Sequence, residues 1–471
     1  MSKETLHRLV YVAGDFISTS IAVLLYNIYR FHHDTSGFDS LTTYLTNDAV
    51  EMEQLLIPVF MLGVYWLTGY YNTVFLKSRL QELGNTIAAV AIGVVIFFFV
   101  ALIDDLPPDR HSAYLSLLVL AGIMFGCVYP VRIVITMSVT RSIRRGQWCR
   151  NALIVGTTQK AVDLCRRISD AKEDMGLLPV GFISTDERVD ENKEIEGLPV
   201  YSIENLPEVC AELNVSDFVV ISHKNGFRAT IELINGLLPY GLPVLMAPDL
   251  YSMLTAQKRI SNIVGEPLVD LAHANISNST RNIKRLLDIT LSSVALMVLS
   301  PLMLCLSILV KLDSPGPVIY RQERIGQHKR PFTLYKFRSM RPDAEIDGPL
   351  LSSLNDSRVT GIGRFMRKYR LDELPQFWNV IKGDMSLVGP RPERAYYIKE
   401  IMRHTPYYTL VQQVRPGLTS LGMVKYGYAS TVEGMLERLR YDLMYLENVS
   451  ILMDLKIMIY TIKTVFTGKG I

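Results

Sequence analysis

Four apolar runs constrain the fold of this chain more than any other feature, because each has about the 20 residues that a helix needs to cross a bilayer. They are Leu55–Phe75, Leu83–Ile103, Ser112–Val131 and, with Asp15 inside it, Leu9–Tyr29. The mean hydropathy is positive, and only 20% of the 471 residues are charged. The first run lacks the small-residue cleavage site of a signal peptide. We therefore expect a multidomain membrane protein whose residues 1–145 form an N-terminal four-transmembrane-helix bundle.

Charges in the loops predict how this bundle is oriented. Residues 31–54 carry five acids and no Lys or Arg, and residues 104–111 carry three acids and one Arg. Basic residues without acids follow the second and fourth runs: Lys77, Arg79, Arg132, Arg141, Arg144, Arg145 and Arg150. The positive-inside rule then places both ends of the bundle, and the start of all that follows, on the cytoplasmic side.

Residues 146–265 alternate short apolar runs such as NALIVG and DFVVIS with helical patterns. This rhythm predicts a Rossmann-like α/β cytoplasmic domain with a parallel sheet. The first turn, Gly156–Ala161, has one glycine where a dinucleotide fingerprint needs three, which favours a structural or regulatory domain over a cofactor site. Residues 266–280 are expected to be a linker. Five scattered cysteines indicate neither disulfides nor zinc, and a net charge of +3 gives no sign of a nucleic-acid partner.

A fifth run, Ile289–Val310, has 22 residues without a charge. Both flanks are basic: Arg281, Lys284 and Arg285 precede it, and residues 321–341 hold seven Lys/Arg against one Glu. Two basic flanks predict that both ends lie on one face. Ser300 and Pro301 lie in the middle, where proline removes a helical hydrogen bond and the serine hydroxyl can satisfy the freed carbonyl. We expect a re-entrant helix-break-helix over residues 283–312; the alternative is a proline-kinked complete span.

The stretch RLDELPQ places two adjacent carboxylates, Asp372 and Glu373, in a basic region. Pro375 and Gly383 bracket a helix, so the pair lies just ahead of its start or at a kink. Cations occur in the surrounding motifs: Lys336, Arg338, Arg367, Arg391 and Arg415. Carboxylates, a divalent ion and converging cations fit a pyrophosphate substrate, whose developing negative charge must be neutralised. The alternative is a set of surface ion pairs worth about 0–1 kcal/mol each.

The motifs YKFRSM, LDELPQFWNVIKGDMSLVGPRPE and VRPG closely resemble the catalytic domain of monotopic polyprenyl-phosphate phosphoglycosyl transferases, the bacterial sugar transferase family. With the preceding modules, the chain is similar to the large, three-module type. The resemblance implies a C-terminal α-rich catalytic domain over residues 281–471. It also implies that Asp372 attacks the β-phosphorus of a UDP-sugar, that Glu373 holds Mg2+, and that Lys336, Arg367 and Arg391 contact phosphates or order the site.

The same resemblance implies transfer of a sugar-1-phosphate to polyprenyl (undecaprenyl) phosphate with release of UMP, as the first step of capsule, exopolysaccharide or O-antigen synthesis. The expected location is the bacterial inner membrane, with the catalytic domain on the cytoplasmic face and a homodimer as the assembly. A transferase that moves the sugar alone and releases UDP, and a non-enzymatic scaffold, are the alternatives.

The chain departs from the family pattern after VRPG, where Leu418–Tyr428 replaces the common TGxxQVxGR-type stretch. The identity of the sugar therefore cannot be carried over. The last apolar helix, Val449–Phe466, suits either a membrane interface or a core.

Overall fold

The computed structural model describes residues 3–33, 38–72, 77, 79–99, 110–171, 175–184, 194–221, 227–247, 268–271, 274, 276–341, 356–427 and 429–466. The chain divides into two compact units. The first contains Met1–Cys149 with Lys172–Gly176 and Ser277–Ile283; the second contains Arg150–Ala171, Leu177–Ile276 and Lys284–Ile471. This division does not separate the α/β domain from most of residues 281–471, the predicted catalytic region, so the domain boundaries and the linker at 266–280 stay predictions.

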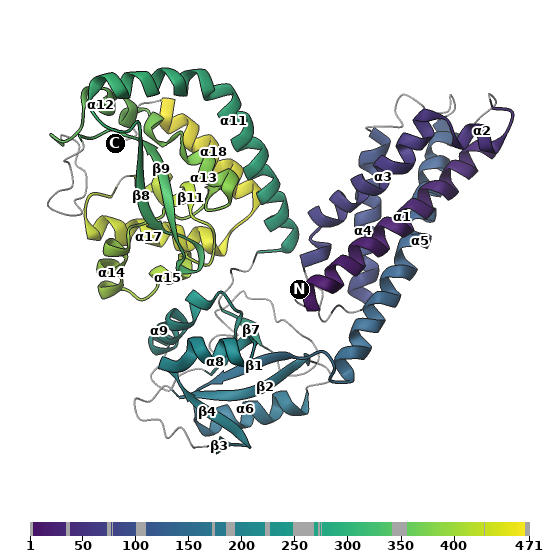
Figure 1. Cartoon of the computed structure of the whole chain (residues 1–471), viewed down its shortest axis with the longest axis horizontal. Helices are drawn as coiled ribbons and strands as arrows, with labels where there is room; N and C mark the ends of the chain where they lie inside the picture. Colours follow the sequence, from purple (N-terminus) through teal and green to yellow (C-terminus); the bar gives the residue numbers. More distant parts are fainter. Residues whose placement is uncertain are drawn as a thin grey trace. The chain divides into compact units, whose positions relative to one another are not determined.

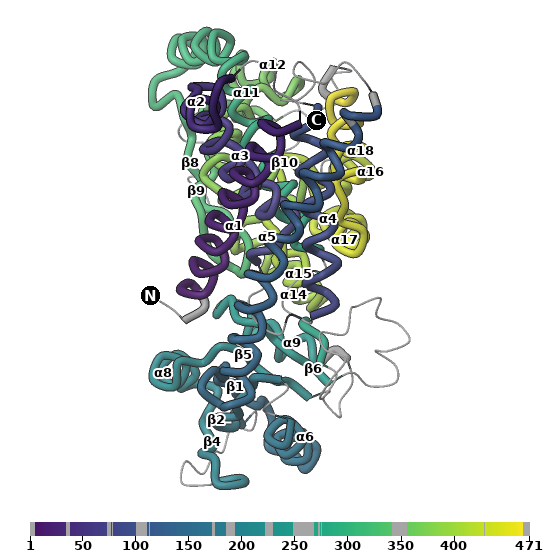
Figure 2. The backbone as a smooth tube through the Cα atoms, turned by 90° about the vertical axis from the view of Figure 1, so that its right-hand side faces the viewer, coloured from purple at the N-terminus to yellow at the C-terminus, as the bar shows by residue number. Residues whose placement is uncertain are grey.

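Long helices that run side by side make up most of the first unit (Figures 1 and 2). They are α1 (Lys3–His33), α3 (Asp48–Leu67), α4 (Arg79–Phe97) and α5 (Arg110–Arg144), with the short α2 (Leu41–Leu45) and η1 (Tyr70–Asn72) between them. α1 packs against α3 and α5, and α4 packs against α5. Among the described residues, α1, α3, α4, α5 and α11 (Asn278–Asp313) are long and apolar enough to cross a membrane. The chain thus has the helices of a membrane protein.

Buried charged side chains lie between the packed helices of the first unit. The guanidinium of Arg132 donates from Nε to Asp15 Oδ1 at 2.7 Å and from Nη2 to Asp15 Oδ2 at 2.8 Å, and Tyr71 donates to the same carboxylate at 2.8 Å. The Asp15 that interrupts the first apolar run is therefore paired, as a charge inside a helix bundle must be to offset its desolvation.

A seven-stranded sheet forms the α/β part of the second unit, in the order β3-β4-β2-β1-β5-β6-β7. Its strands are β1 (Arg150–Val155), β2 (Leu177–Ser184), β3 (Glu194–Ile195), β4 (Leu198–Ser202), β5 (Val215–Val220), β6 (Val244–Met246) and β7 (Val269–Asp270). The central strands from β4 to β6 are parallel, and only β3 and β7 pair antiparallel. This confirms the predicted parallel α/β sheet, in the strand order of a doubly wound fold.

Helices α6 (Gln159–Asp170), α8 (Leu206–Glu212) and α9 (Phe227–Leu237) connect the strands of this sheet (Figure 1). α9 contacts the catalytic region directly. Asn235 on α9 donates to the carbonyl of Pro406 at 3.1 Å, and Lys329 donates to the carbonyl of Asn235 at 2.5 Å. Tyr407 and Leu410 pack against the apolar core of the sheet. These contacts explain why the two parts form one compact unit.

The catalytic region is rich in helices, as predicted. After α11 come the hairpin β8 (Ile319–Ile325) and β9 (Pro331–Phe337), then α12 (Gly361–Lys368), η6 (Leu371–Glu373), α13 (Gln376–Lys382) and β10 (Ser386–Val388). The remainder contains α14 (Ala395–His404), α15 (Tyr408–Val411), β11 (Gly417–Thr419), α16 (Leu421–Lys425), α17 (Val432–Glu447) and α18 (Ile451–Phe466). β10 and β11 form a short parallel pair. The loop that follows β10 also contacts the start of β11, where the Gly417 N–H donates to the carbonyl of Pro390 at 2.9 Å.

α11 is one continuous helix with Pro301 inside it, whereas the sequence predicted a break at this point. Figure 1 shows α11 bending along its length. Proline cannot donate to the carbonyl four residues earlier, that of Met297, and the Ser300 hydroxyl donates to this carbonyl at 2.8 Å. The predicted role of the serine is thus confirmed, and it explains why a bend replaces a break.

α18 has two different faces. Ile457 is buried in the catalytic core, whereas Leu452, Ile459 and Ile462 are exposed. Each of the two expected roles of this helix therefore fits one of its faces. The buried face belongs to a core, and the exposed apolar face suits a membrane interface.

Candidate active site

The two carboxylates lie on the single 3-10 turn η6, between α12 and α13. Arg370 precedes this turn in the left-handed conformation, with φ of 53°, and so redirects the chain after α12 ends at Lys368. α13 then begins at Gln376, directly after Pro375, and ends at Lys382, followed by the capping Gly383, whose φ is 98°. The proline and glycine thus bracket the helix as predicted. The pair precedes the helix, and the alternative of a kink inside one long helix is wrong.

Glu373 gathers three cations around its carboxylate. Its Oε1 lies 3.3 Å from Lys336 Nζ and 3.5 Å from Arg391 Nη2, and its Oε2 lies 3.4 Å from Arg370 Nη1. Burial would raise the pKa of Glu373, but these three cations outweigh it and hold the pKa below the ordinary value. Glu373 is therefore a fixed negative charge that positions the surrounding cations.

Asp372 is buried, with 8% of its surface exposed. Burial and the neighbouring Glu373 carboxylate raise the pKa of Asp372, while Lys336, Arg367 and Arg370 oppose the rise. Adjacent acids thus have pKa values shifted in opposite directions, a pattern that marks functional carboxylates. Asp372 is therefore the more basic of the two carboxylates.

Lys336 comes from β9, where it pairs in register with Tyr320 of β8. Asn379 on α13 fixes this strand against the helix: its amide nitrogen donates to the carbonyl of Thr333 at 2.7 Å, and its amide oxygen accepts from the Tyr335 N–H at 3.1 Å. Asn379 is fully buried. Sequence reasoning missed this residue, because nothing in the run QFWNVIK distinguishes a buried asparagine from a surface one.

We predict that Asn379→Ala lowers the free energy of unfolding by about 2–3 kcal/mol, because the hydrogen bonds to the Thr333 carbonyl and from the Tyr335 N–H are lost. Turnover should fall by about tenfold as Lys336 moves relative to Glu373. Asn448→Ala, at an exposed asparagine, is the matched control and should shift unfolding by less than about 0.5 kcal/mol. Thermal unfolding and initial rates check this prediction; equal effects of the two variants would contradict it.

Arg391 reaches the site from the loop after β10. Besides its contact with Glu373, its Nη1 donates to Met423 Sδ at 3.2 Å. The loop is held tightly, since a Cβ on Gly389 would lie 2.4 Å from the carbonyl oxygen of Arg415, and a Cβ on Gly417 would lie 2.4 Å from that of Gly389. Only glycines allow this approach. The close packing of these two loops explains why both motifs carry glycine.

The stretch that departs from the family pattern borders the site through α16, because Met423 contacts Arg391. Ser420 caps α16 by accepting from the Met423 N–H at 3.0 Å. Tyr428, the last residue of the stretch, lies outside the described residues. Direct contact with a phosphate-binding candidate makes this segment a candidate for recognition of the sugar.

The remaining predicted residues lie in different surroundings. Arg367 is near enough to lower the pKa of Asp372. Arg338 is buried and donates to the carbonyls of Val310 and Ser314 at the end of α11, at 3.2 and 2.6 Å. Arg415 is half-buried beside Gly389. The structure thus groups Lys336, Arg367 and Arg391 around the carboxylates, together with Arg370, and it places Arg338 against α11. Glu–Arg spacing of i, i+3 could have identified Arg370.

The raised pKa of Asp372 and the lowered pKa of Lys336 together predict a narrow pH range for activity. The raised pKa of Asp372 means that its carboxylate is lost, as pH falls, sooner than an ordinary aspartate with a pKa of 3.8. Burial lowers the pKa of Lys336, so its charge is lost, as pH rises, sooner than that of a free lysine. We expect a bell-shaped rate profile with both limbs displaced inward. A rate that stays constant down to about pH 4 would contradict the assignment of Asp372.

The donors at this site suit a magnesium ion that is shared with a substrate. Among the described residues no three His, Cys, Asp or Glu side chains form a metal cluster. Mg2+ in phosphate-transferring sites is usually held by one or two carboxylates together with substrate phosphates. The carboxylate of Glu373 meets this requirement.

Comparisons with known proteins agree with the geometry. The model of the Bacterial sugar transferase family matches residues 279–468. A UDP-N-acetylgalactosamine-undecaprenyl-phosphate N-acetylgalactosaminephosphotransferase from Aeromonas hydrophila is 39% identical over 229 residues, which are 49% of this chain and 53% of that protein. A UDP-glucose:undecaprenyl-phosphate glucose-1-phosphate transferase from Escherichia coli (strain K12) is 36% identical over 241 residues, 51% of this chain and 52% of that protein.

This chain spans about half the length of these two relatives. The chain covers a far larger share of a shorter relative. The exopolysaccharide production protein PSS from Rhizobium leguminosarum bv. phaseoli is 40% identical over 195 residues, which are 40% of this chain and 98% of that protein. The chain therefore belongs to the bacterial sugar transferase family, the polyprenyl-phosphate phosphoglycosyl transferases that its motifs resemble.

Proposed function

We propose that this protein transfers a sugar-1-phosphate from a UDP-sugar to polyprenyl (undecaprenyl) phosphate and releases UMP. The observation that carries the proposal is the buried Asp372 beside Glu373, whose carboxylate gathers Lys336, Arg370 and Arg391 within 3.5 Å. Undecaprenyl-phosphate sugar phosphotransferases among the relatives support the same reaction. The product would initiate a surface polysaccharide such as an exopolysaccharide, a capsule or an O-antigen.

The reaction proceeds in two displacements. A carboxylate oxygen of Asp372 attacks the β-phosphorus of the UDP-sugar, the bond from this phosphorus to the bridging oxygen breaks, and UMP leaves with that oxygen. An oxygen of polyprenyl phosphate then attacks the same phosphorus and releases Asp372, forming the lipid diphosphate sugar. Attacking groups and phosphates are all anionic, so Lys336, Arg367 and Arg391 are needed to neutralise the charge.

Magnesium is proposed as the cofactor, held by Glu373 and the substrate diphosphate. When bound, it would neutralise phosphate charge at the reacting centre. The cations around Glu373 keep this carboxylate ionised and positioned before a substrate arrives.

We further propose that α11 enters and leaves the membrane on one face, which makes the catalytic region monotopic. Arg285 near the start of α11 donates to the carbonyls of Val380 and Ile381 at 2.7 and 2.8 Å. Near its end, Leu306 and Val310 pack against Phe337 and Met366. Both ends thus contact the same catalytic fold, while side chains between them, Met297 and Val298 among them, are exposed. A complete span would separate these two ends across a bilayer.

Labelling of engineered cysteines tests this topology. In a cysteine-free background, we expect Arg281→Cys and Ser314→Cys to react with a membrane-impermeant maleimide in inverted vesicles, and neither to react in sealed spheroplasts. The reason is that both positions flank the apolar run on the same face. Labelling of one position from each side would indicate the complete span.

The mass of the lipid product tests the reaction. Detergent-purified protein with Mg2+, polyprenyl phosphate and UDP-glucose or UDP-N-acetylgalactosamine, the donors named for its relatives, should yield a lipid diphosphate sugar. A lipid monophosphate sugar would instead indicate transfer of the sugar alone. Absence of any lipid product across a broad donor panel would favour a scaffold.

We also propose that the protein lies in the bacterial inner membrane, that its active site faces the cytoplasm, and that it assembles as a homodimer.

A further inference from the structure

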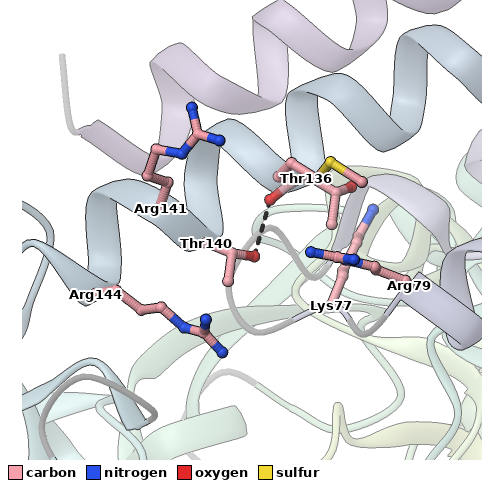
Figure 3. A pocket seen from close by; sticks show the side chains of 7 residues that line it. Lys77, Arg79, Thr136, Thr140, Arg141 and Arg144 are labelled. Carbon is pink, nitrogen blue, oxygen red and sulfur yellow. Dashed lines mark hydrogen bonds between the residues drawn. The ribbon is translucent and has the colours of Figure 1, made fainter.

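A cavity of about 620 Å3 lies in the first unit, where α4 begins and α5 ends. Figure 3 shows Lys77 and Arg79 on one side of Thr136 and Thr140, with Arg141 and Arg144 on the other. Met137 completes the lining. The described lining thus has four cations and no carboxylate. The volume of the cavity is within the range of about 300–1,000 Å3 that is usual for small-molecule sites.

Lys77 is held in place at the cavity before any ligand binds. Only 4% of its side chain is exposed, its Nζ donates to the carbonyl of Tyr70 at 3.0 Å, and it lies 3.4 Å from the centre of the Tyr70 ring. Burial lowers the pKa of Lys77 to about 8, so most of the side chain remains charged at neutral pH. A fixed, largely desolvated ammonium interacts more strongly with an anion than an exposed one does.

One carboxylate lies behind the cavity, and other groups already satisfy it. Glu82 is fully buried, accepts hydrogen bonds from Tyr70 and from Thr136 at 3.4 Å, and lies 4.0 Å from Lys77 Nζ. It offsets at most one of the four positive charges. Arg79, Arg141 and Arg144 are exposed at the cavity. Among the described residues, the lining therefore has more positive than negative groups, which suits an anion.

The chemistry of the lining favours phosphate. Arginines bind phosphate oxygens through paired N–H groups, and a lysine adds a point charge. The Thr140 hydroxyl already donates to the carbonyl of Thr136 at 2.9 Å, so recognition depends on the cations. Arg79 begins one candidate membrane span and Arg144 ends another. Lipid phosphates lie at this level of a bilayer, and basic pockets between helices bind such head groups.

We propose that this cavity binds the phosphate group of a membrane lipid, at a site separate from Asp372. The inference goes beyond the proposed reaction and does not depend on it. A glycerophospholipid and polyprenyl phosphate share the required group, and the experiment distinguishes them from each other and from soluble phosphate.

Native mass spectrometry of the full-length protein in detergent tests the proposal by counting bound lipid. The probes are phosphatidylglycerol, polyprenyl phosphate and, as a lipid without phosphate, diacylglycerol; inorganic phosphate serves as a competitor. The Arg141→Gln/Arg144→Gln double variant removes two cations from the lining. Arg145→Gln is the matched control, because Arg145 is an exposed neighbour that does not line the cavity.

We expect the double variant to bind phosphatidylglycerol, or one equivalent of polyprenyl phosphate, at least about tenfold more weakly, because charge-assisted hydrogen bonds are lost. Arg145→Gln should bind as the parent does, and diacylglycerol should not bind at the site. The lipid that loses affinity identifies the source of the phosphate. Unchanged binding in the double variant, equal weakening in Arg145→Gln, or competition by inorganic phosphate without lipid binding would overturn the proposal.

Discussion

Asp372→Asn is expected to abolish the covalent phosphosugar-enzyme and to lower turnover by at least about 10^4-fold. An amide of nearly the same size keeps the packing of this buried turn but removes the nucleophilic carboxylate, and loss of a nucleophile has an effect of this order in enzymes with covalent intermediates. The measurement is intact mass after incubation with the UDP-sugar alone. The parent should gain the mass of a sugar phosphate, and the variant should not.

Asp313→Asn is the matched control for this variant. Asp313 is an exposed aspartate of the same region. Its carboxylate accepts from the Ile362 N–H at 3.2 Å, and an amide oxygen can accept the same hydrogen bond. Labelling and turnover should stay within about twofold of the parent. Normal turnover by Asp372→Asn would refute the assignment of the nucleophile.

Glu373→Gln is expected to lower turnover by about 10^2- to 10^3-fold and to raise the Mg2+ concentration needed for half-maximal rate. The change removes the charge that holds Lys336, Arg370 and Arg391 together, and loss of one partner in a buried charge network costs about 3–5 kcal/mol. It also removes a carboxylate ligand of the proposed ion. Initial rates over a range of Mg2+ concentrations check both effects.

Glu437→Gln provides the comparison for a surface ion pair. Glu437 lies 3.0 Å from Arg440 on α17, but 47% of its side chain is exposed. Such pairs contribute about 0–1 kcal/mol, so this variant should match the parent in rate and in Mg2+ dependence. If Glu373→Gln behaved in the same way, the cations around it would be ordinary surface ion pairs, the alternative that the sequence allowed.

Local features of the site followed from the sequence because they depend on neighbours along the chain. The start and end of α13 are set by Pro375 and Gly383, and the hydroxyl of Ser300 replaces the bond that the adjacent Pro301 removes. Long-range partners did not follow. Asn379 acts across 46 positions on Thr333, and Arg338 acts across 24 on Ser314. No local pattern specifies which carbonyl a buried polar side chain will meet.

The buried ion pair between Asp15 and Arg132 in the first unit could not be predicted from the sequence for the same reason. The charge of Asp15 within an apolar run is visible in the sequence, but its partner Arg132 lies 117 positions away and was assigned only to the basic flank of the fourth run. Helix packing decides that these two residues meet. The described structure therefore adds to the sequence chiefly the pairing of charges that are distant along the chain.

The nucleotide released during turnover tests the central claim most directly. Purified protein, Mg2+ and polyprenyl phosphate are incubated with a panel of UDP-sugars, and the nucleotide product is identified by chromatography. Transfer of a sugar-1-phosphate through Asp372 predicts UMP with the active donor. Release of UDP would contradict this account, because it would mean that the sugar moves without its phosphate.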